Sequence, residues 1–288
     1  MSHLFAPFQP ESDEPRRRRF KPIPIRMIIP NLITLFSLCL GLTAIRLAVD
    51  GKLELAITSI VIAGVLDGID GRIARLLHST SRFGAELDSL ADFVSFGVAP
   101  AMLLYFWGLN SLHSAGWIAV LVFAICAGLR LARFNVAIDD PNKPPYAVNF
   151  FTGVPAPAGA MIVMLPIYLE LMGLPHTIAS SVIALVYTVA VGLLMVSWIP
   201  TWSGKGVSGR VPREHVLTIM ICVVFVGALL VSYPWEMLSL GSLAYIACIP
   251  VAYLQYQKLK RAYVAASGGM INPEATEAAE ERPAGPLN

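Results

Sequence analysis

The sequence has 288 residues, of which 56% are hydrophobic and only 14% are charged. Soluble domains carry about 25% charged residues, so this composition excludes an ordinary soluble domain and indicates a membrane protein. The net charge of +2 is too small to indicate a nucleic-acid partner.

Residues 1–26 are polar, contain proline and include four consecutive arginines at 16–19, followed by Lys21. No small-residue cleavage site follows the first apolar run, so we expect a basic cytoplasmic arm and not a cleaved signal peptide. At the other end, residues 264–288 are rich in Ala, Glu, Gly and Pro and are predicted to be disordered. The four cysteines lie in apolar runs without metal-ligand or redox spacing, and we interpret them as packing residues.

Between these ends lie about eight apolar segments of the length that a hydrocarbon core of ~30 Å requires, which is about 20 residues each. They are residues 28–49, 53–77, 84–109, 116–137, 156–172, 178–199, 216–231 and 238–263. The fifth and seventh are short, and the second and third carry charge at their ends. The sequence therefore predicts an all-α fold, a polytopic membrane bundle of about eight transmembrane helices.

Basic residues alternate between the two sides that these segments define. If the N-terminus is cytoplasmic, nearly every Lys and Arg falls on the cytoplasmic side, and the outer loops at 108–115, 173–177 and 232–236 contain none. The positive-inside rule then predicts that both termini are cytoplasmic. We expect a multi-pass protein of the inner (cytoplasmic) membrane.

Four aspartates stand inside two neighbouring segments, where an ionisable side chain costs about 2.5–3.5 kcal/mol on insertion scales. Asp67 and Asp70 lie three residues apart on one helical face, and Asp88 and Asp92 lie four apart on the next helix. A short connection lets the two faces meet. Four facing carboxylates repel one another unless cations lie between them, and oxygen ligands suit Mg²⁺ or Mn²⁺. The cluster therefore predicts a site for two divalent cations.

Small residues accompany the aspartates, namely Gly64, Gly68, Gly71, Ala74 and Gly84. Small residues favour close helix packing in membranes, but they also leave room for a ligand against the helix backbone. Both interpretations stay open for Gly64 and Gly68, whereas the position of the other three among the acids favours a ligand pocket. Arg75 is either an anchor at the membrane interface or a phosphate-binding residue.

The segment from Asp67 to Asp92 resembles the signature of the CDP-alcohol phosphatidyltransferases. That pattern, D-x2-D-G-x2-A-R-x8-G-x3-D-x3-D, is matched at every fixed position. The resemblance implies a helical membrane enzyme whose core spans residues 27–203. It leaves residues 204–263 as a cytoplasmic loop and two further membrane helices.

The resemblance also implies roles for the acids. Asp67, Asp70 and Asp88 would be ligands of a two-metal site that also binds the diphosphate of a CDP-linked substrate. Asp92 would complete the shell of the second metal and act as general base on the attacking hydroxyl. Glu86 lies outside the pattern and about 200° from Asp88 around an ideal helix, so we leave it out of the site.

The remaining matched residues are assigned to the CDP moiety by the same resemblance. Gly71, Ala74 and Gly84 would line the cytidine and ribose pocket, and Arg75 would contact phosphate. The first segment adds Asn31 and Thr34, because its opening resembles the Pro-Asn-x-x-Thr of the family. These two share a helical face and are expected to reach the nucleotide. Asn31 is equally suited to cap the helix, and both roles can hold together.

Four stretches, at residues 92–101, 129–135, 151–158 and 195–203, resemble the phosphatidylserine synthase branch of the family. The resemblance therefore implies transfer of the phosphatidyl group from CDP-diacylglycerol to the hydroxyl of L-serine, with release of CMP. Trp198 departs from this branch, in which a basic residue is expected at that position.

Serine brings a carboxylate, an ammonium group and a hydroxyl. Arg130 and Arg133, one turn apart near the cytoplasmic end of the fourth segment, are candidates to pair with the carboxylate. The alternative is that they are positive-inside anchors. Ser95 and Asn135 are further candidate contacts of the acceptor. The histidines have no partner spacing and receive no role.

Alternatives stay open at two levels. The first alternative keeps the family but changes the acceptor to choline, glycerol 3-phosphate or inositol phosphate. The second alternative is a different class of protein, a divalent-cation transporter, since intramembrane acids often mark ion pathways. Transport favours acids near the bilayer midplane, whereas these lie near the basic ends of their segments. The expected partners are CDP-diacylglycerol, L-serine and membrane lipid, a homodimer is implied by the family alone, and no nucleic acid is expected.

Overall fold

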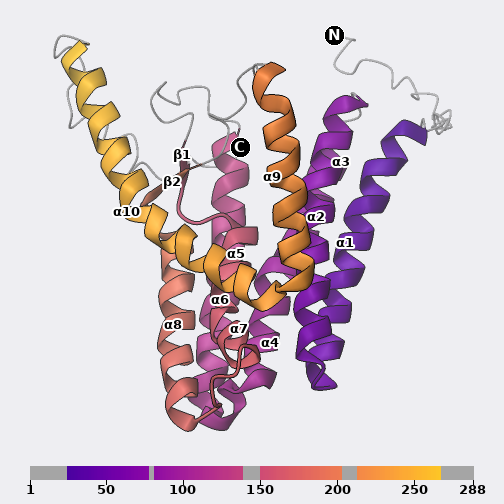
Figure 1. The fold of residues 1–288 in the computed structure, drawn as a ribbon, viewed down its shortest axis with the longest axis vertical. Helices are drawn as coiled ribbons and strands as arrows, with labels where there is room; N and C mark the ends of the chain where they lie inside the picture. Colours follow the sequence, from indigo (N-terminus) through magenta and orange to yellow (C-terminus); the bar gives the residue numbers. More distant parts are fainter. Residues whose placement is uncertain (1–24, 78–80, 139–149, 203–212, 267–288) are drawn as a thin grey trace, which may run out of the picture.

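The computed structural model describes residues 25–77, 81–138, 150–202 and 213–266 (Figure 1). The basic arm before residue 25, most of the loop after residue 203 and most of the C-terminal tail lie outside these described residues. The final helix continues to Ala266, past the end predicted at residue 263.

Helices cover most of every predicted apolar segment, although the one predicted at 178–199 ends at Val196. The helices are α1 (Ile25–Val49), α2 (Leu53–Leu76), α3 (Arg82–Asp92), the π-helical turn η1 (Phe93–Val98), α4 (Ala99–Trp107), the 3₁₀ turn η2 (Leu109–Leu112), α5 (His113–Ile138), α6 (Ala156–Val163), α7 (Leu165–Leu171), α8 (Ile178–Val196), α9 (Arg213–Ser232) and α10 (Pro234–Ala266). Two short strands, β1 (Phe150–Thr152) and β2 (Pro200–Trp202), were not predicted. The prediction of an all-α helical bundle is confirmed.

Within the described residues, five helical stretches are long and apolar enough to cross a membrane. They are Ile28–Val49, Arg82–Trp107, Leu109–Ala137, Ile178–Val196 and Pro234–Tyr263. Large apolar side chains on the outside of the bundle, such as Phe36 and Val224, are more than half exposed, as expected for lipid contact. The protein is therefore a multi-pass membrane protein. A crossing by α2, α6–α7 or α9 stays a prediction, because α2 carries more charge and the other two are shorter.

The first two helices form an antiparallel hairpin (Figure 1). Gly51 ends α1 with a φ of 72°, and Lys52 N donates to Leu47 O at 2.9 Å, the bond that closes a Schellman motif. Further along the pair, the Ser37 hydroxyl donates to the Ala63 carbonyl at 3.0 Å. This register places the start of α1 beside the end of α2, where Asp70 stands.

The fifth apolar segment is broken into α6 and α7 around Met164. Pro166 has no backbone N–H, so the carbonyl of Ile162 loses the helical donor that it would otherwise have. The Tyr187 hydroxyl of α8 donates to that carbonyl at 2.9 Å instead. The break is thus satisfied by a neighbouring helix, as membrane burial requires.

The two strands join the chain before α6 to the chain after α8. They pair antiparallel, with Phe151 opposite Thr201, and the Thr201 hydroxyl donates to the Gly153 carbonyl at 2.7 Å. Gly153 has a φ of 77°, and a Cβ there would lie 2.2 Å from the Met195 carbonyl oxygen. Strand β2 packs against α10, which runs obliquely across the bundle (Figure 1).

Candidate metal and nucleotide site

The acidic site is built where α1, α2 and α3 meet. α1 packs against both other helices, so its first turns form a wall beside the end of α2 and the start of α3. Ser81 caps α3 by accepting a hydrogen bond from Gly84 N at 3.0 Å. The cap fixes where α3 begins and therefore which of its residues face α1 and α2.

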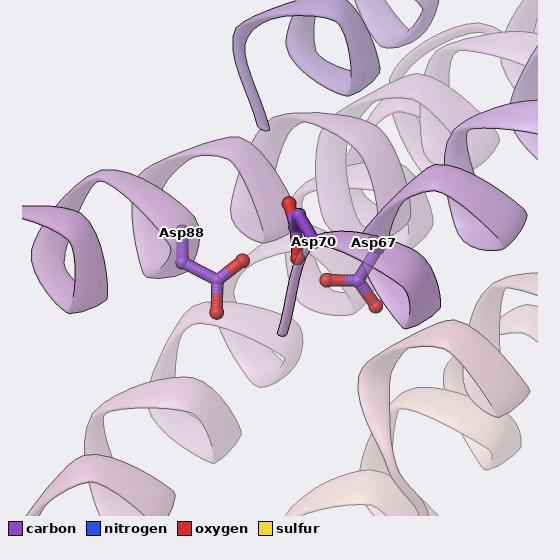
Figure 2. A group of neighbouring side chains, drawn as sticks. All are labelled: Asp67, Asp70 and Asp88. Atoms are coloured by element: carbon purple, nitrogen blue, oxygen red, sulfur yellow. The ribbon is translucent and has the colours of Figure 1, made fainter. Parts of the chain in front are cut away.

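Three of the four aspartates form a compact group. Asp67 and Asp70 come from α2 and Asp88 comes from α3, and one carboxylate oxygen of each lies within 4.8 Å of the others. Figure 2 shows the carboxyl groups of Asp67 and Asp88 directed toward each other, with Asp70 between them in this view. The structure thus brings three of the four aspartates together, as expected from the short connection between the two helices.

This group fits a divalent cation. Asp88 Oδ1 is buried and has no hydrogen-bond partner among the described residues. An unsatisfied buried oxygen costs about 1–3 kcal/mol or more when it is charged, so it indicates an absent ligand of positive charge. The ligand atoms are all carboxylate oxygens, the donor type that Mg²⁺ and Mn²⁺ prefer.

Asp92 stands beside this group and is not one of the three. It is the last residue of α3, and its carboxyl contacts that of Asp67. The π-helical turn η1 starts at the next residue. Such turns often occur at functional sites, because the wider backbone re-aims the side chains that follow. Asp92 also interacts electrostatically with Arg130 of α5. It therefore connects the acidic group to the fourth predicted segment.

A cleft opens beside the acidic group, with Asp70 and Asp88 in its wall. It brings together all the residues predicted for the CDP moiety, namely Asn31, Thr34, Gly71, Ala74, Arg75 and Gly84. These residues come from three helices, so the cleft forms because α1 packs against both α2 and α3.

The small residues of this region divide into two kinds. A Cβ on Gly64 would touch the Phe96 ring at 3.5 Å, which is ordinary helix packing. A Cβ on Gly68 would meet nothing within 4 Å, so packing does not explain that glycine. At Gly84 a Cβ would lie 2.9 Å from Asn31 Oδ1, so any side chain there would narrow the cleft.

Thr34 makes a contact that the sequence did not predict. Its hydroxyl donates to Asp70 Oδ2 at 2.7 Å and also lies 3.1 Å from the Pro30 carbonyl oxygen. Both Thr34 and Asp70 are buried. Thr34 therefore orients a carboxylate of the acidic group, and its place in the cleft wall is compatible with a nucleotide contact as well.

Replacing Thr34 by Val is expected to weaken Mn²⁺ binding by about 10- to 100-fold, the usual cost of losing a partner that orients a metal ligand. Titration of Mn²⁺ into the purified protein measures this directly. Thr34→Ser keeps the hydroxyl and should bind normally. Thr43→Val is the matched control, because the Thr43 hydroxyl is exposed and donates only within α1, to Cys39 O at 2.6 Å. Unchanged Mn²⁺ affinity in Thr34→Val would show that the bond does not orient a ligand.

The two arginines proposed for the acceptor lie in different surroundings. Arg130 is buried, with 7% of its surface exposed, and its guanidinium lies 5.0 Å from the centre of the Phe134 ring. Arg133 stacks on Trp198, with 4.3 Å between the guanidinium carbon and the ring centre. Trp198, where a basic residue was expected, thus serves as a platform for a cation. Burial beside Asp92 favours Arg130 as the ligand-binding member of the pair.

The other two acceptor candidates have protein partners. Ser95 is fully buried, and its hydroxyl donates to the Ser37 carbonyl of α1 at 3.2 Å. A Cβ on Gly41 would lie 2.5 Å from the same hydroxyl, so α1 covers Ser95 closely. This placement argues against the predicted acceptor contact of Ser95. Asn135 donates to the Ser89 hydroxyl of α3 at 2.9 Å, which ties α5 to the helix that carries Asp88 and Asp92.

Sequence reasoning missed one polar residue near Arg130. Tyr245 of α10 has a buried hydroxyl, and it interacts electrostatically with the Arg130 guanidinium. No local signal could have found it, because it belongs to no motif and lies far along the chain from the acidic cluster.

Comparison with known proteins gives two family matches. Residues 27–203 match the family described as CDP-alcohol phosphatidyltransferase, and residues 214–250 match the one described as CDP-alcohol phosphatidyltransferase 2.

Three similar proteins carry the name CDP-diacylglycerol–serine O-phosphatidyltransferase. The one from Mycobacterium leprae is 39% identical over 241 residues, which cover 84% of this chain and 78% of the relative. The protein from Helicobacter pylori is 36% identical over 71% of this chain and 84% of its own. The protein from Methanocaldococcus jannaschii is 34% identical over 69% of this chain and 84% of its own.

Proposed function

The chain belongs to the CDP-alcohol phosphatidyltransferase family, and we propose that it transfers the phosphatidyl group of CDP-diacylglycerol to the hydroxyl of L-serine, giving phosphatidylserine and CMP. The observation that carries the proposal is the cleft between α1, α2 and α3, which joins the residues predicted for the CDP moiety to the acidic group. The names of the relatives support serine as the acceptor.

Asp67, Asp70 and Asp88, with Asp92 beside them, would hold two divalent cations, Mg²⁺ or Mn²⁺. When bound, these cations supply positive charge that neutralises the diphosphate of the substrate. Thr34 keeps the Asp70 carboxylate in one orientation through its hydrogen bond of 2.7 Å. Arg75, at the edge of the cleft, binds a phosphate oxygen, and the small residues Gly71 and Gly84 leave room for the nucleotide.

Asp92 acts as the general base. It accepts the proton of the serine hydroxyl while that oxygen forms a bond to the phosphorus that bears diacylglycerol. The bond between this phosphorus and the oxygen of CMP breaks, and CMP leaves with the electron pair. General-base assistance of this kind contributes about 10²–10⁴-fold to a rate. The position of Asp92 between the acidic group and Arg130 supports this role.

The reaction takes place at the cytoplasmic face of the inner membrane. The lipid tails stay in the bilayer while the nucleotide and serine come from water, which suits a cleft near the end of α2 and the start of α3. Arg72, Arg75 and Arg82 stand near those ends, and the positive-inside rule assigns them to the cytoplasm.

The test is acceptor-dependent release of CMP. Purified protein with Mn²⁺ or Mg²⁺ and CDP-diacylglycerol should release CMP when L-serine is added, and not with glycerol 3-phosphate, choline or inositol phosphate. Release driven only by one of the other acceptors would move the protein to another branch of the family. A divalent-cation transporter would release no CMP and would carry Mn²⁺ into sealed vesicles.

A further inference from the structure

The buried hydroxyl of Tyr245 on α10 has no hydrogen-bond partner among the described residues. Buried tyrosine hydroxyls usually find a partner, as Tyr187 does with the Ile162 carbonyl at 2.9 Å. An orphaned hydroxyl at a buried position therefore indicates a ligand that supplies the missing bond.

The surroundings of Tyr245 decide which kind of ligand fits. The Arg130 guanidinium interacts electrostatically with both the Tyr245 hydroxyl and the Asp92 carboxylate. No described carboxylate lies within 4.0 Å of Arg130, so its charge is not consumed by a close ion pair in the described part of the chain. Arg130 thus lies between Asp92 of the acidic site and Tyr245 of α10.

Thr201 of β2, the polar residue next to Tyr245, already has a hydrogen-bond partner. The Thr201 hydroxyl lies next to Tyr245 but donates its proton to the Gly153 carbonyl at 2.7 Å. The strand pair that carries Thr201 packs against α10, and the Phe150 ring meets the Tyr256 ring of α10 at 5.4 Å. The strand pair therefore helps to hold α10 in the position that brings Tyr245 to Arg130.

A guanidinium and a phenol hydroxyl together offer hydrogen-bond donors to one anion. A planar carboxylate accepts from both, and the charge-assisted bonds are the strong ones. An ammonium group is repelled by Arg130 and drawn toward the aspartates. We propose that Tyr245 and Arg130 together bind the carboxylate of the acceptor, so that α10 completes the acceptor site. This assignment rests on the proposed function with serine.

The proposal gives α10 a role beyond membrane anchoring. Tyr245 lies outside residues 27–203 and inside the second matched range, residues 214–250. An acceptor held by its carboxylate at Arg130 and Tyr245 lies with its hydroxyl toward Asp92, the residue that accepts the proton. Tyr245 is therefore a specificity-determining residue and not part of the nucleotide cleft.

Tyr245→Phe tests the proposal, because it removes one oxygen and keeps the ring. The KM for L-serine should rise about 10-fold or more, the size expected for losing a hydrogen bond to a charged group. The KM for CDP-diacylglycerol and the Mn²⁺ affinity should stay at the wild-type value, and the effect should fall on KM more than on kcat. Tyr245→His keeps a donor and should give a smaller rise in the KM for serine.

Tyr253→Phe is the matched control, because Tyr253 lies on the same helix with an exposed hydroxyl that only accepts from Gln257 at 3.2 Å. A wild-type KM for serine in Tyr245→Phe would overturn the assignment. So would an equal rise in the KM of both substrates, since that indicates damage to the fold. If the wild-type protein releases CMP with another acceptor only, the proposed function fails first and this inference fails with it.

Discussion

Asp88→Asn should abolish tight Mn²⁺ binding and lower CMP release by about a thousandfold. Asp88 is the one member of the compact acidic group that comes from α3, and its buried Oδ1 has no protein partner. Asn removes the negative charge and puts an NH₂ group where a lone pair is needed. Metal ions supply several kcal/mol of charge stabilisation in such reactions, and each ~1.4 kcal/mol is a factor of ten in rate.

Calorimetric titration with Mn²⁺ and a CMP-release assay measure the two effects of Asp88→Asn on the same preparation. Glu86→Gln is the control, because Glu86 is an exposed carboxylate on the same helix, outside the acidic group. It should leave both measurements unchanged. If Asp88→Asn binds Mn²⁺ as the wild type does, the acidic group is not the metal site.

Asp92→Asn should lower CMP release by about 10²–10⁴-fold, the usual contribution of a general base, while the protein still binds at least one Mn²⁺ tightly. The reason is geometric: Asp92 contacts Asp67 but lies outside the group of three. The two variants therefore separate the proton acceptor from the main metal ligands.

The measurement for Asp92→Asn is single-turnover CMP release at saturating serine, alongside the Mn²⁺ titration. Full activity would remove the general-base assignment. If Asp92→Asn loses all Mn²⁺ binding, as Asp88→Asn is expected to lose tight binding, then Asp92 is as necessary for binding the metal as Asp88.

The sequence by itself determined the class of the fold and which residues were predicted to form the nucleotide site. Hydropathy and helical period are local properties, so the apolar segments and the spacing of Asp67 with Asp70 and of Asp88 with Asp92 could be read directly. The cleft residues were also predictable, because a fixed spacing relates Gly71 and Arg75 to those acids. The strands β1 and β2 could not be predicted, since each has only three residues and is stabilised by the other.

The surroundings of Ser95 could not be predicted from the sequence. It was predicted to contact the acceptor, and it stands in the stretch at residues 92–101 that resembles the phosphatidylserine synthase branch. It lies within the π-helical turn η1, which no pattern in the sequence indicated. Its hydroxyl donates to the Ser37 carbonyl of α1 at 3.2 Å, a contact between helices that residue spacing does not record.

Only the tertiary structure decided which residues contact the acids and the arginines predicted for the acceptor. The Thr34–Asp70 bond, the stacking of Arg133 on Trp198 and the approach of Tyr245 to Arg130 all join residues from different helices. Such contacts depend on how helices cross and rotate against each other, which helix packing sets and no short pattern records. The sequence thus determined the spacing of the acids and of the residues predicted for the nucleotide, and the packing of α5 and α10 decided the surroundings of the residues predicted for the acceptor.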